Sequence, residues 1–185
     1  MCGYAFYVGK SLTFTDFKDA YMKSNIVERG GDGDKLAQLS NDCFMGHSLF
    51  HVTSVEPVFQ PLKIVGGYLL FNGEVYNYKE LKNKINYRKF YSKSDTEVLL
   101  YLYEELGEKF VNFLNGIFSF VIYDRKKNKL IFARDRFGVK PLYFYQDIKK
   151  IVLSTEARPI LKINKRFRAN YSEIKNYISS GTLYH

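Results

Sequence analysis

One long apolar run constrains the fold of this chain more than any other segment. Residues Gly116–Tyr123 form the strongest hydrophobic stretch of the sequence and are rich in aromatic and β-branched side chains. Asp124–Asn128 follows with turn-forming residues, and Lys129–Arg134 then resumes an apolar pattern. Together these segments predict a β-hairpin. Antiparallel pairing is therefore expected at the centre of the fold.

The other predicted elements also group into antiparallel strands, with helices before and after them. Strands are predicted over residues 1–8, 44–53, 57–65 and 68–72, and a second hairpin over 143–145 and 151–154. Helices are predicted from Thr13 or Thr15 to Ser24, and over 78–86, 94–106, 156–161 and 172–180. Because strands and helices do not alternate strictly, the pattern favours an α+β fold. Arg29–Asp34 is expected to be a glycine-rich loop.

The net charge of +9, from 28 basic and 19 acidic residues, raises the possibility of a nucleic-acid partner. The basic residues are scattered, and the sequence has no RNA-recognition signature and no zinc-ligand spacing. No apolar run reaches the ~20 residues of a membrane span, and the N-terminus does not resemble a signal peptide. The two cysteines indicate no disulfide framework. We therefore predict a cytoplasmic protein that binds neither nucleic acid nor membrane.

The first three residues are Met1-Cys2-Gly3. If Met1 is removed, Cys2 carries a thiol and a free α-amine, which are a nucleophile and a base on one residue. Their usual pKa values, about 8.5 and about 8, make proton transfer between them nearly balanced at neutral pH. Alone this signal is weak, since a small residue after the initiator is common.

Several later stretches are unusually rich in glycine and polar residues for a chain that only needs a core. They are Arg29-Gly30-Gly31-Asp32, Gly46-His47, Phe71-Asn72-Gly73-Glu74-Val75-Tyr76-Asn77, Ser94-Asp95-Thr96-Glu97, the string Ala133-Arg134-Asp135-Arg136-Phe137-Gly138-Val139-Lys140-Pro141-Leu142-Tyr143, and Ser154-Thr155-Glu156-Ala157. With Cys2, these strings resemble the glutaminase domain of class II glutamine amidotransferases of the asparagine synthetase B type. That family belongs to the N-terminal-nucleophile hydrolases. The resemblance runs from Cys2 to about Leu161.

The resemblance implies a four-layer αββα sandwich of two antiparallel sheets flanked by helices, and hydrolysis of L-glutamine to L-glutamate and ammonia. Cys2 would be the nucleophile, with its α-amine as the base, and Asn72 and Gly73 would donate to the oxyanion. Asp95 would hold the glutamine α-ammonium with support from Glu74. The remaining substrate-binding positions implied by the family motif are Arg29, Leu49, Phe50, His51, Val52 and Thr53.

Each motif also has a purely structural interpretation. Asn72-Gly73 alone would predict a tight hairpin turn, and Ser94–Glu97 alone would predict a helix N-cap. His47 is interpreted as a hydrogen-bonded core histidine rather than a catalytic one. Cys43 is interpreted as a small core residue, and Arg134–Arg136 as an ion network.

The sequence departs from the family at position 49, where Leu49 replaces the arginine that would bind the glutamine α-carboxylate. Losing such a charge-assisted pair, at about 1.5–3 kcal/mol per hydrogen bond, would weaken binding roughly 10- to 1000-fold. Three explanations remain open: another group such as Arg29 or His51 receives the carboxylate, backbone amides of residues 49–53 suffice, or the substrate is not free glutamine. Gly31 also stands where the family usually has proline.

One domain is predicted over residues 1–185, with a core over 2–161 and a lead-in over 162–185 to a synthetase domain beyond the chain. That domain, C-terminal or separate, would receive the ammonia. No cofactor is expected here, since ATP and magnesium belong to the synthetase domain and the chain lacks an ATP-pyrophosphatase signature. A homodimer is possible. The alternative is a catalytically weak scaffold, which Leu49 mainly supports. A nucleic-acid-binding function has the least support.

Overall fold

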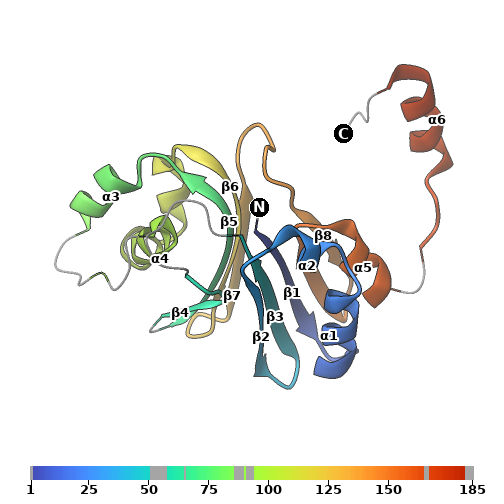
Figure 1. Ribbon diagram of the computed structural model, residues 1–185, viewed down its shortest axis with the longest axis horizontal. Helices are drawn as coiled ribbons and strands as arrows, with labels where there is room; N and C mark the ends of the chain where they lie inside the picture. The colour runs from blue at the N-terminus through green and yellow to red at the C-terminus, as the bar shows by residue number, and fades with distance from the viewer. Residues whose placement is uncertain are drawn as a thin grey trace.

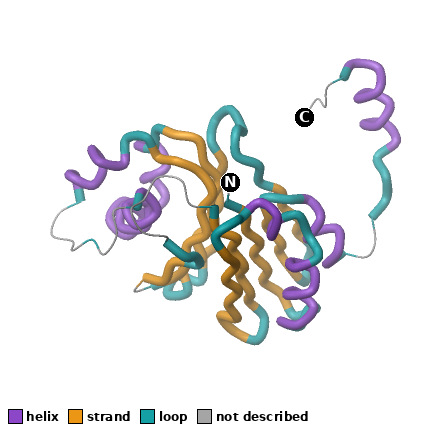
Figure 2. The backbone as a smooth tube through the Cα atoms, in the orientation of Figure 1, coloured by secondary structure: helices purple, strands orange, loops and turns teal. Residues whose placement is uncertain are grey.

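The computed structural model describes residues 2–50, 58–64, 66–85, 90, 94–164 and 167–181. Two antiparallel sheets lie face to face, with helices on both outer faces (Figure 1). The predicted α+β sandwich of four layers is therefore confirmed. Figure 2 shows the strands gathered between two groups of helices.

The first sheet has five strands in the order β2-β3-β1-β9-β8. Their bounds are β1 Gly3–Gly9, β2 Gly33–Ser40, β3 Cys43–Leu49, β8 Tyr143–Gln146 and β9 Lys150–Ser154. Strand β1 is central, and Gly3 pairs with Ser48 of β3 while Ala5 pairs with Ser154 of β9. The N-terminal segment is consequently fixed on one side from its third residue and on the other side from its fifth residue onward.

The second sheet has four strands in the order β4-β5-β6-β7. Their bounds are β4 Leu62–Ile64, β5 Gly67–Val75, β6 Gly116–Asp124 and β7 Lys129–Arg134. The predicted central hairpin is strands β6 and β7, with Asp124 opposite Lys129. Strand β5 pairs along its whole length with β6, so Asn72 lies opposite Ser119 and Gly73 opposite Phe118.

Helices cover the outer face of each sheet. The five-stranded sheet is covered by α1 (Phe14–Met22), α2 (Ile26–Arg29) and α5 (Ala157–Ile163), and the four-stranded sheet by α3 (Tyr78–Lys84), α4 (Asp95–Leu106) and the 3-10 helix η1 (Gly107–Phe113). Helix α6 (Tyr171–Ser180) has no buried residue and lies away from the sheets in Figure 1. None of the helices in the described ranges is long and apolar enough to cross a bilayer.

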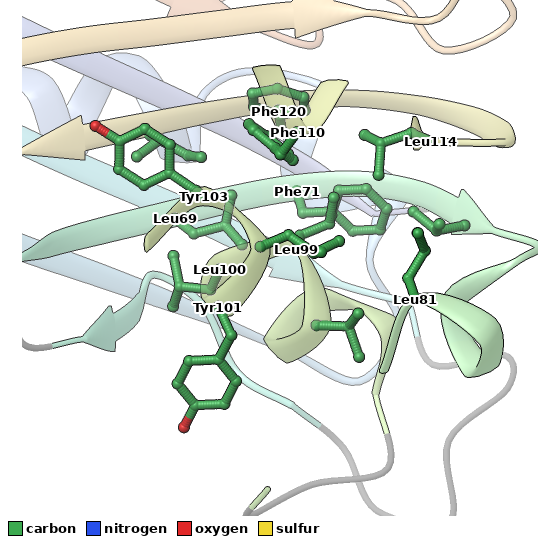
Figure 3. Packing of buried hydrophobic residues seen from close by; sticks show 14 of the residues in the cluster. Leu69, Phe71, Leu81, Leu99, Leu100, Tyr101, Tyr103, Phe110, Leu114 and Phe120 are labelled. Atoms are coloured by element: carbon green, nitrogen blue, oxygen red, sulfur yellow. The ribbon is translucent and has the colours of Figure 1, made fainter. Parts of the chain in front are cut away.

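Strand alternation divides the core into three layers of side chains. On β1, Tyr4 and Phe6 face the other sheet, whereas Ala5 and Tyr7 face α1 and α5. Phe71 and Phe120 of the second sheet pack under α4 and η1, as Figure 3 shows. All six of these side chains are almost fully excluded from water, a burial that is worth about 1.5–3 kcal/mol for each large side chain.

Some predicted boundaries differ from the structure. Strand β2 was not predicted, because its exposed residues lack a clear alternation, and helix α2 was not predicted either. The predicted loop Arg29–Asp34 is too long, since Arg29 ends α2 and Gly33 begins β2. Within the predicted strand over 57–65, the described residues form a strand only over Leu62–Ile64, while β5 extends past residue 72 to Val75. Ser94 caps α4 by accepting from the Thr96 amide at 3.2 Å, as predicted. Residues 51–57 lie outside the described residues.

Candidate active site

Cys2 lies immediately before β1, and three contacts hold it there. Its Sγ lies 3.4 Å from both the backbone nitrogen and the carbonyl oxygen of Phe50. Its own carbonyl accepts from Nε of Arg29 at 3.3 Å. Two residues further, the Tyr4 amide donates to the hydroxyl of Thr155 at 3.0 Å. The thiol is thereby placed at the junction of β1, β3 and the segment after β9.

The Cys2 thiol is partly withdrawn from water, and this burial is the main reason that its pKa is raised. The hydrogen bond with the Phe50 backbone and the positive charge of Lys140 lower the thiol pKa, and the negative charge of Glu74 raises it. Cys43, in contrast, is fully buried in the layer between the sheets, as predicted for a small core residue.

Asn72 and Gly73 belong to the interior of β5, not to a turn, so the hairpin-turn interpretation is wrong. A Cβ atom on Gly73 would lie 2.2 Å from the carbonyl oxygen of Ile117, so only glycine allows this approach to β6. Asn72 is 1 % exposed, and its Nδ2 has no hydrogen-bond partner among the described residues. A buried amide donor without a partner is costly and usually indicates a functional role.

Asp95 stands at the start of α4 and accepts from the Val75 amide at 2.9 Å through Oδ2. Burial is the main cause that raises the pKa of this carboxyl, and the hydrogen bonds it accepts work against that shift. Asp95 thus joins the start of α4 to Val75, which ends β5 and lies two residues beyond Gly73. The predicted division of roles is consistent with this placement, since Ser94 caps the helix and leaves Asp95 for other contacts.

Leu49 ends β3 and is 5 % exposed, so its apolar side chain is buried. The carbonyl of Leu49 accepts from the amides of Gly31 at 3.0 Å and Asp32 at 3.1 Å. Proline has no N–H to donate, so this contact gives a physical reason for glycine at position 31. A Cβ on Gly30 would lie 2.4 Å from Oγ of Ser48, which shows how closely the loop approaches β3.

Arg29 is engaged by two partners, because it pairs with Glu156 through Nη1 and reaches the Cys2 carbonyl through Nε. Two nitrogens of its guanidinium are therefore engaged by other parts of the chain. Phe50 is 44 % exposed and contacts the Cys2 sulfur through its backbone. The predicted site residues His51, Val52 and Thr53 lie outside the described residues.

His47 is fully buried between the sheets, as predicted for a core residue. The expectation that it is hydrogen-bonded is wrong for the described part of the chain, where neither ring nitrogen has a partner with good geometry. Burial lowers its pKa to about 3, against a smaller opposing influence of the Phe71 backbone. His47 is therefore neutral at physiological pH.

Asp135 has a role that the sequence did not reveal. Its carboxylate accepts four backbone amides, those of Phe118, Phe137, Val139 and Lys140, at 3.0–3.2 Å. The predicted ion network with Arg134 and Arg136 is not formed, since neither arginine is among its described partners. Burial alone would raise the pKa of Asp135, but these four amides lower it below its usual value.

Several contributors to the site were not singled out from the sequence. Lys140 and Glu156 lie inside the strings that carried the resemblance, but no spacing rule marked them. Gln60 is buried against β5, where it accepts from the Phe71 amide at 2.6 Å and donates to the Phe71 carbonyl at 3.2 Å. Like a neighbouring strand, the Gln60 side chain bonds both backbone groups of Phe71, the residue directly before Asn72. Only the folded structure reveals this contact.

Comparison with known proteins agrees with this geometry. Residues 1–184 match the family model described as a glutamine amidotransferase domain, so the chain belongs to that family. Within it, the chain is a class II domain of the asparagine synthetase B type, as predicted from the sequence strings.

The similar curated proteins are much longer than this chain. It is 34 % identical over 169 residues to asparagine synthetase [glutamine-hydrolyzing] 3 of Bacillus subtilis, a match covering 87 % of this chain and 27 % of that protein. It is 39 % identical over 127 residues to asparagine synthetase [glutamine-hydrolyzing] of Asparagus officinalis, covering 66 % of this chain and 21 % of that protein. The chain thus spans about a quarter of the length of such relatives.

Among solved structures, glutamine phosphoribosylpyrophosphate amidotransferase from B. subtilis, complexed with ADP and GMP, superposes with a TM-score of 0.67 at 20 % identity. The match covers 88 % of this chain and 43 % of that chain. A second structure, described as the allosteric regulatory enzyme of purine biosynthesis, gives a TM-score of 0.68 at 19 % identity with the same coverage. At these identities the likeness concerns the fold alone, and it confirms the predicted sandwich.

The Asp135 loop yields a prediction about stability. Replacing Asp135 by asparagine removes the charge that four amides share, so we expect the free energy of unfolding at pH 7 to fall by about 2–4 kcal/mol. The pKa of this carboxyl is lower in the folded than in the unfolded protein, so its contribution is full above about pH 5 and declines as the pH falls.

Urea unfolding followed by circular dichroism from pH 7 to pH 3 measures both effects. The difference between wild type and Asp135→Asn should shrink toward pH 3. Asp19→Asn, which removes an exposed ion pair with Lys23, serves as the control and should change stability by less than about 1 kcal/mol. A difference that stays constant with pH would contradict the charge-based account of the loop.

Proposed function

We propose that this chain is the glutaminase domain of an asparagine-synthetase-like enzyme and hydrolyses L-glutamine to L-glutamate and ammonia. The observation that carries the proposal is the buried Asn72 amide, which has no partner in the described part of the chain. It lies on β5, the strand of Glu74, whose negative charge raises the pKa of the Cys2 thiol. Asn72 and Glu74 are two residues apart on β5, so both project from the same face of the sheet.

The proposed reaction starts after removal of Met1. The Cys2 thiol gives its proton to the Cys2 α-amine, and the thiolate attacks the side-chain carbonyl carbon of glutamine. The carbonyl oxygen becomes an oxyanion, for which Nδ2 of Asn72 and the backbone N–H of Gly73 are the donors. The C–N bond then breaks, and the α-ammonium returns its proton to the leaving ammonia. A glutamyl thioester on Cys2 remains.

Water completes the cycle by attacking the thioester, with the α-amine accepting its proton. The C–S bond breaks, the thiolate leaves, and glutamate is released. Asp95 would hold the glutamine α-ammonium, with Glu74 nearby, and Phe50 would line the thiol side of the pocket. His51, Val52 and Thr53 retain their proposed place around the substrate on the strength of the family motif alone.

The ammonia would pass to an ATP-dependent amidating domain, either C-terminal to this one or on a separate chain. The support for this part is the name and length of the relatives, which are called asparagine synthetases and of which this chain matches about a quarter. We further propose that ATP and magnesium bind only in that partner domain. A cytoplasmic location and a homodimer are also part of the proposal, and only the amino-acid sequence supports them.

A catalytically weak scaffold is the second candidate, and two observations favour it. Leu49 is apolar and buried where the family's arginine would bind the substrate carboxylate, and Arg29 is already paired with Glu156. The nucleophile and the oxyanion donors are nevertheless retained, which favours the enzyme.

The oxyanion assignment predicts the effect of Asn72→Ala. Removing one donor should lower kcat for glutamine hydrolysis by about 10²–10³-fold with little change in KM. Glutamate release, measured by a coupled glutamate dehydrogenase assay, checks this. Cys2→Ala sets the zero level, and Cys43→Ala is the matched control that should retain activity. Asn72→Ala with unchanged kcat would remove Asn72 from the oxyanion site.

The missing arginine predicts the effect of Leu49→Arg. If the absent carboxylate contact limits binding, KM for glutamine should fall about tenfold or more, with kcat little changed. Leu49→Met, which keeps an apolar side chain of similar size, is the control and should behave as wild type. An unchanged KM in a folded Leu49→Arg protein would mean that another group already binds the carboxylate.

A further inference from the structure

The layer of side chains between the two sheets changes character along its length. Most of it is apolar and consists of Phe6, Cys43, Met45, Leu70, Val121 and Leu153. At one end, two polar register pairs take the place of these residues. Tyr4 of β1 lies opposite His47 of β3. Asn72 of β5 lies opposite Ser119 of β6. These four residues form the polar end of the layer.

Strand alternation directs all four side chains into this layer. Each of the four is two residues away from an apolar member of the layer on its own strand. Residues two apart on a strand project from the same face of the sheet. Directly opposite residues of an antiparallel pair have Cβ atoms about 4.5–5.5 Å apart, so the side chains of Asn72 and Ser119 lie beside each other. Tyr4 and His47 lie beside each other in the same way on the facing sheet.

The polar end is buried, and its polar atoms have no partners within the described ranges. All four residues are fully or almost fully excluded from water. The atoms without a hydrogen bond are Tyr4 Oη, both ring nitrogens of His47, Asn72 Nδ2 and Ser119 Oγ. A buried polar group that bonds nothing is costly, and such groups are rare in folded proteins. Their concentration at one end of one layer points to a group that bonds several of them together.

The two sheets are in contact across this layer. On β1 and β6, the ring centroids of Phe6 and Tyr123 are 5.9 Å apart, and Tyr4 and Ser119 project from the same two faces. Burial raises the pKa of the Tyr4 phenol, and the Ser119 hydroxyl of the facing sheet lowers it. No direct hydrogen bond with good geometry joins these two hydroxyls. A small group between them could bond both.

A water molecule meets these requirements, because a buried water makes about three hydrogen bonds to otherwise unsatisfied polar groups. It can accept from an amide and donate to hydroxyl oxygens. We propose that a buried water bridges the Asn72 amide to the hydroxyls of Ser119 and Tyr4, which are thus positioning residues for the oxyanion donor. The neutral ring of His47 is a further partner for the same water.

This bridge gives the Asn72 amide a fixed orientation. The amide nitrogen carries two N–H groups, of which one is held by the water and the other is left to face the oxyanion. A donor fixed in place beforehand needs no reorganisation during the reaction. The catalytic meaning of the bridge rests on the proposed function, but the bridge itself does not require glutamine.

The first test compares the urea unfolding midpoints of the wild type and Tyr4→Phe, without glutamine. If the water bonds the phenol, its loss breaks the network and lowers the midpoint. Removal of an unpaired buried hydroxyl would leave the midpoint unchanged or raise it, which would overturn the proposal. Tyr7→Phe is the matched control on the same strand. Its hydroxyl lies 3.2 Å from Oγ of Ser11 on the opposite face, so its midpoint should also fall.

The second test is glutamine hydrolysis by the same variants. Tyr4→Phe and Ser119→Ala should each lower kcat by about 3- to 30-fold with little change in KM, which is less than the loss of the donor itself. The double variant should fall by about the same factor as either single variant, because both break one network. Ser119→Cys keeps the volume but bonds weakly, so it should resemble Ser119→Ala, and it replaces that variant if alanine prevents folding. Tyr7→Phe should retain the wild-type kcat.

The two tests separate this inference from the proposed function. Folded Tyr4→Phe and Ser119→Cys proteins with the wild-type kcat would overturn the positioning role and leave glutamine hydrolysis intact. A merely structural role would lower the midpoints without moving kcat, and would overturn it as well. A wild type that hydrolyses no glutamine, together with lowered and non-additive midpoints for Tyr4→Phe and Ser119→Ala, would reject the proposed function and retain the water bridge.

Discussion

The position of β1 at the centre of its sheet is the constraint on which the rest of the structure depends. Because β3 and β9 pair with β1 from Gly3 and Ala5 onward, Cys2 is held at the end of a strand that is buried on both sides. A chain terminus is normally the most mobile part of a protein. Here backbone pairing supplies the order that a nucleophile needs, and the first five residues of the strand are buried.

Two aspartates then fix the irregular segments around that strand end. Asp95 bonds the Val75 amide and joins α4 to β5, and Asp135 gathers four amides of β6 and the β7–β8 loop. In each case one carboxylate satisfies backbone groups that a sheet or helix would otherwise satisfy. The start of α4 and the β7–β8 loop are thereby held by hydrogen bonds to carboxylate oxygens and not by packing alone.

The hairpin of β6 and β7, the helix at Asp95–Leu106 and the sandwich were predictable because apolar periodicity and long motif strings specify them. Strand β2 was not, since its exposed residues give no alternating pattern. Site residues were predictable only where a motif named them. The partners of Arg29 and Asp135 and the burial of Lys140 depend on contacts between segments distant in sequence, which no local pattern encodes.

The most direct test of the central claim is intact mass spectrometry of the protein before and after treatment with the glutamine analogue 6-diazo-5-oxo-norleucine. The account predicts loss of Met1 and a single adduct on Cys2, absent in Cys2→Ala and reduced by competing glutamine. Loss of Met1 without an adduct would contradict a glutamine-binding site and point to another amide substrate. Retention of Met1 would leave Cys2 without its base and contradict the proposed mechanism.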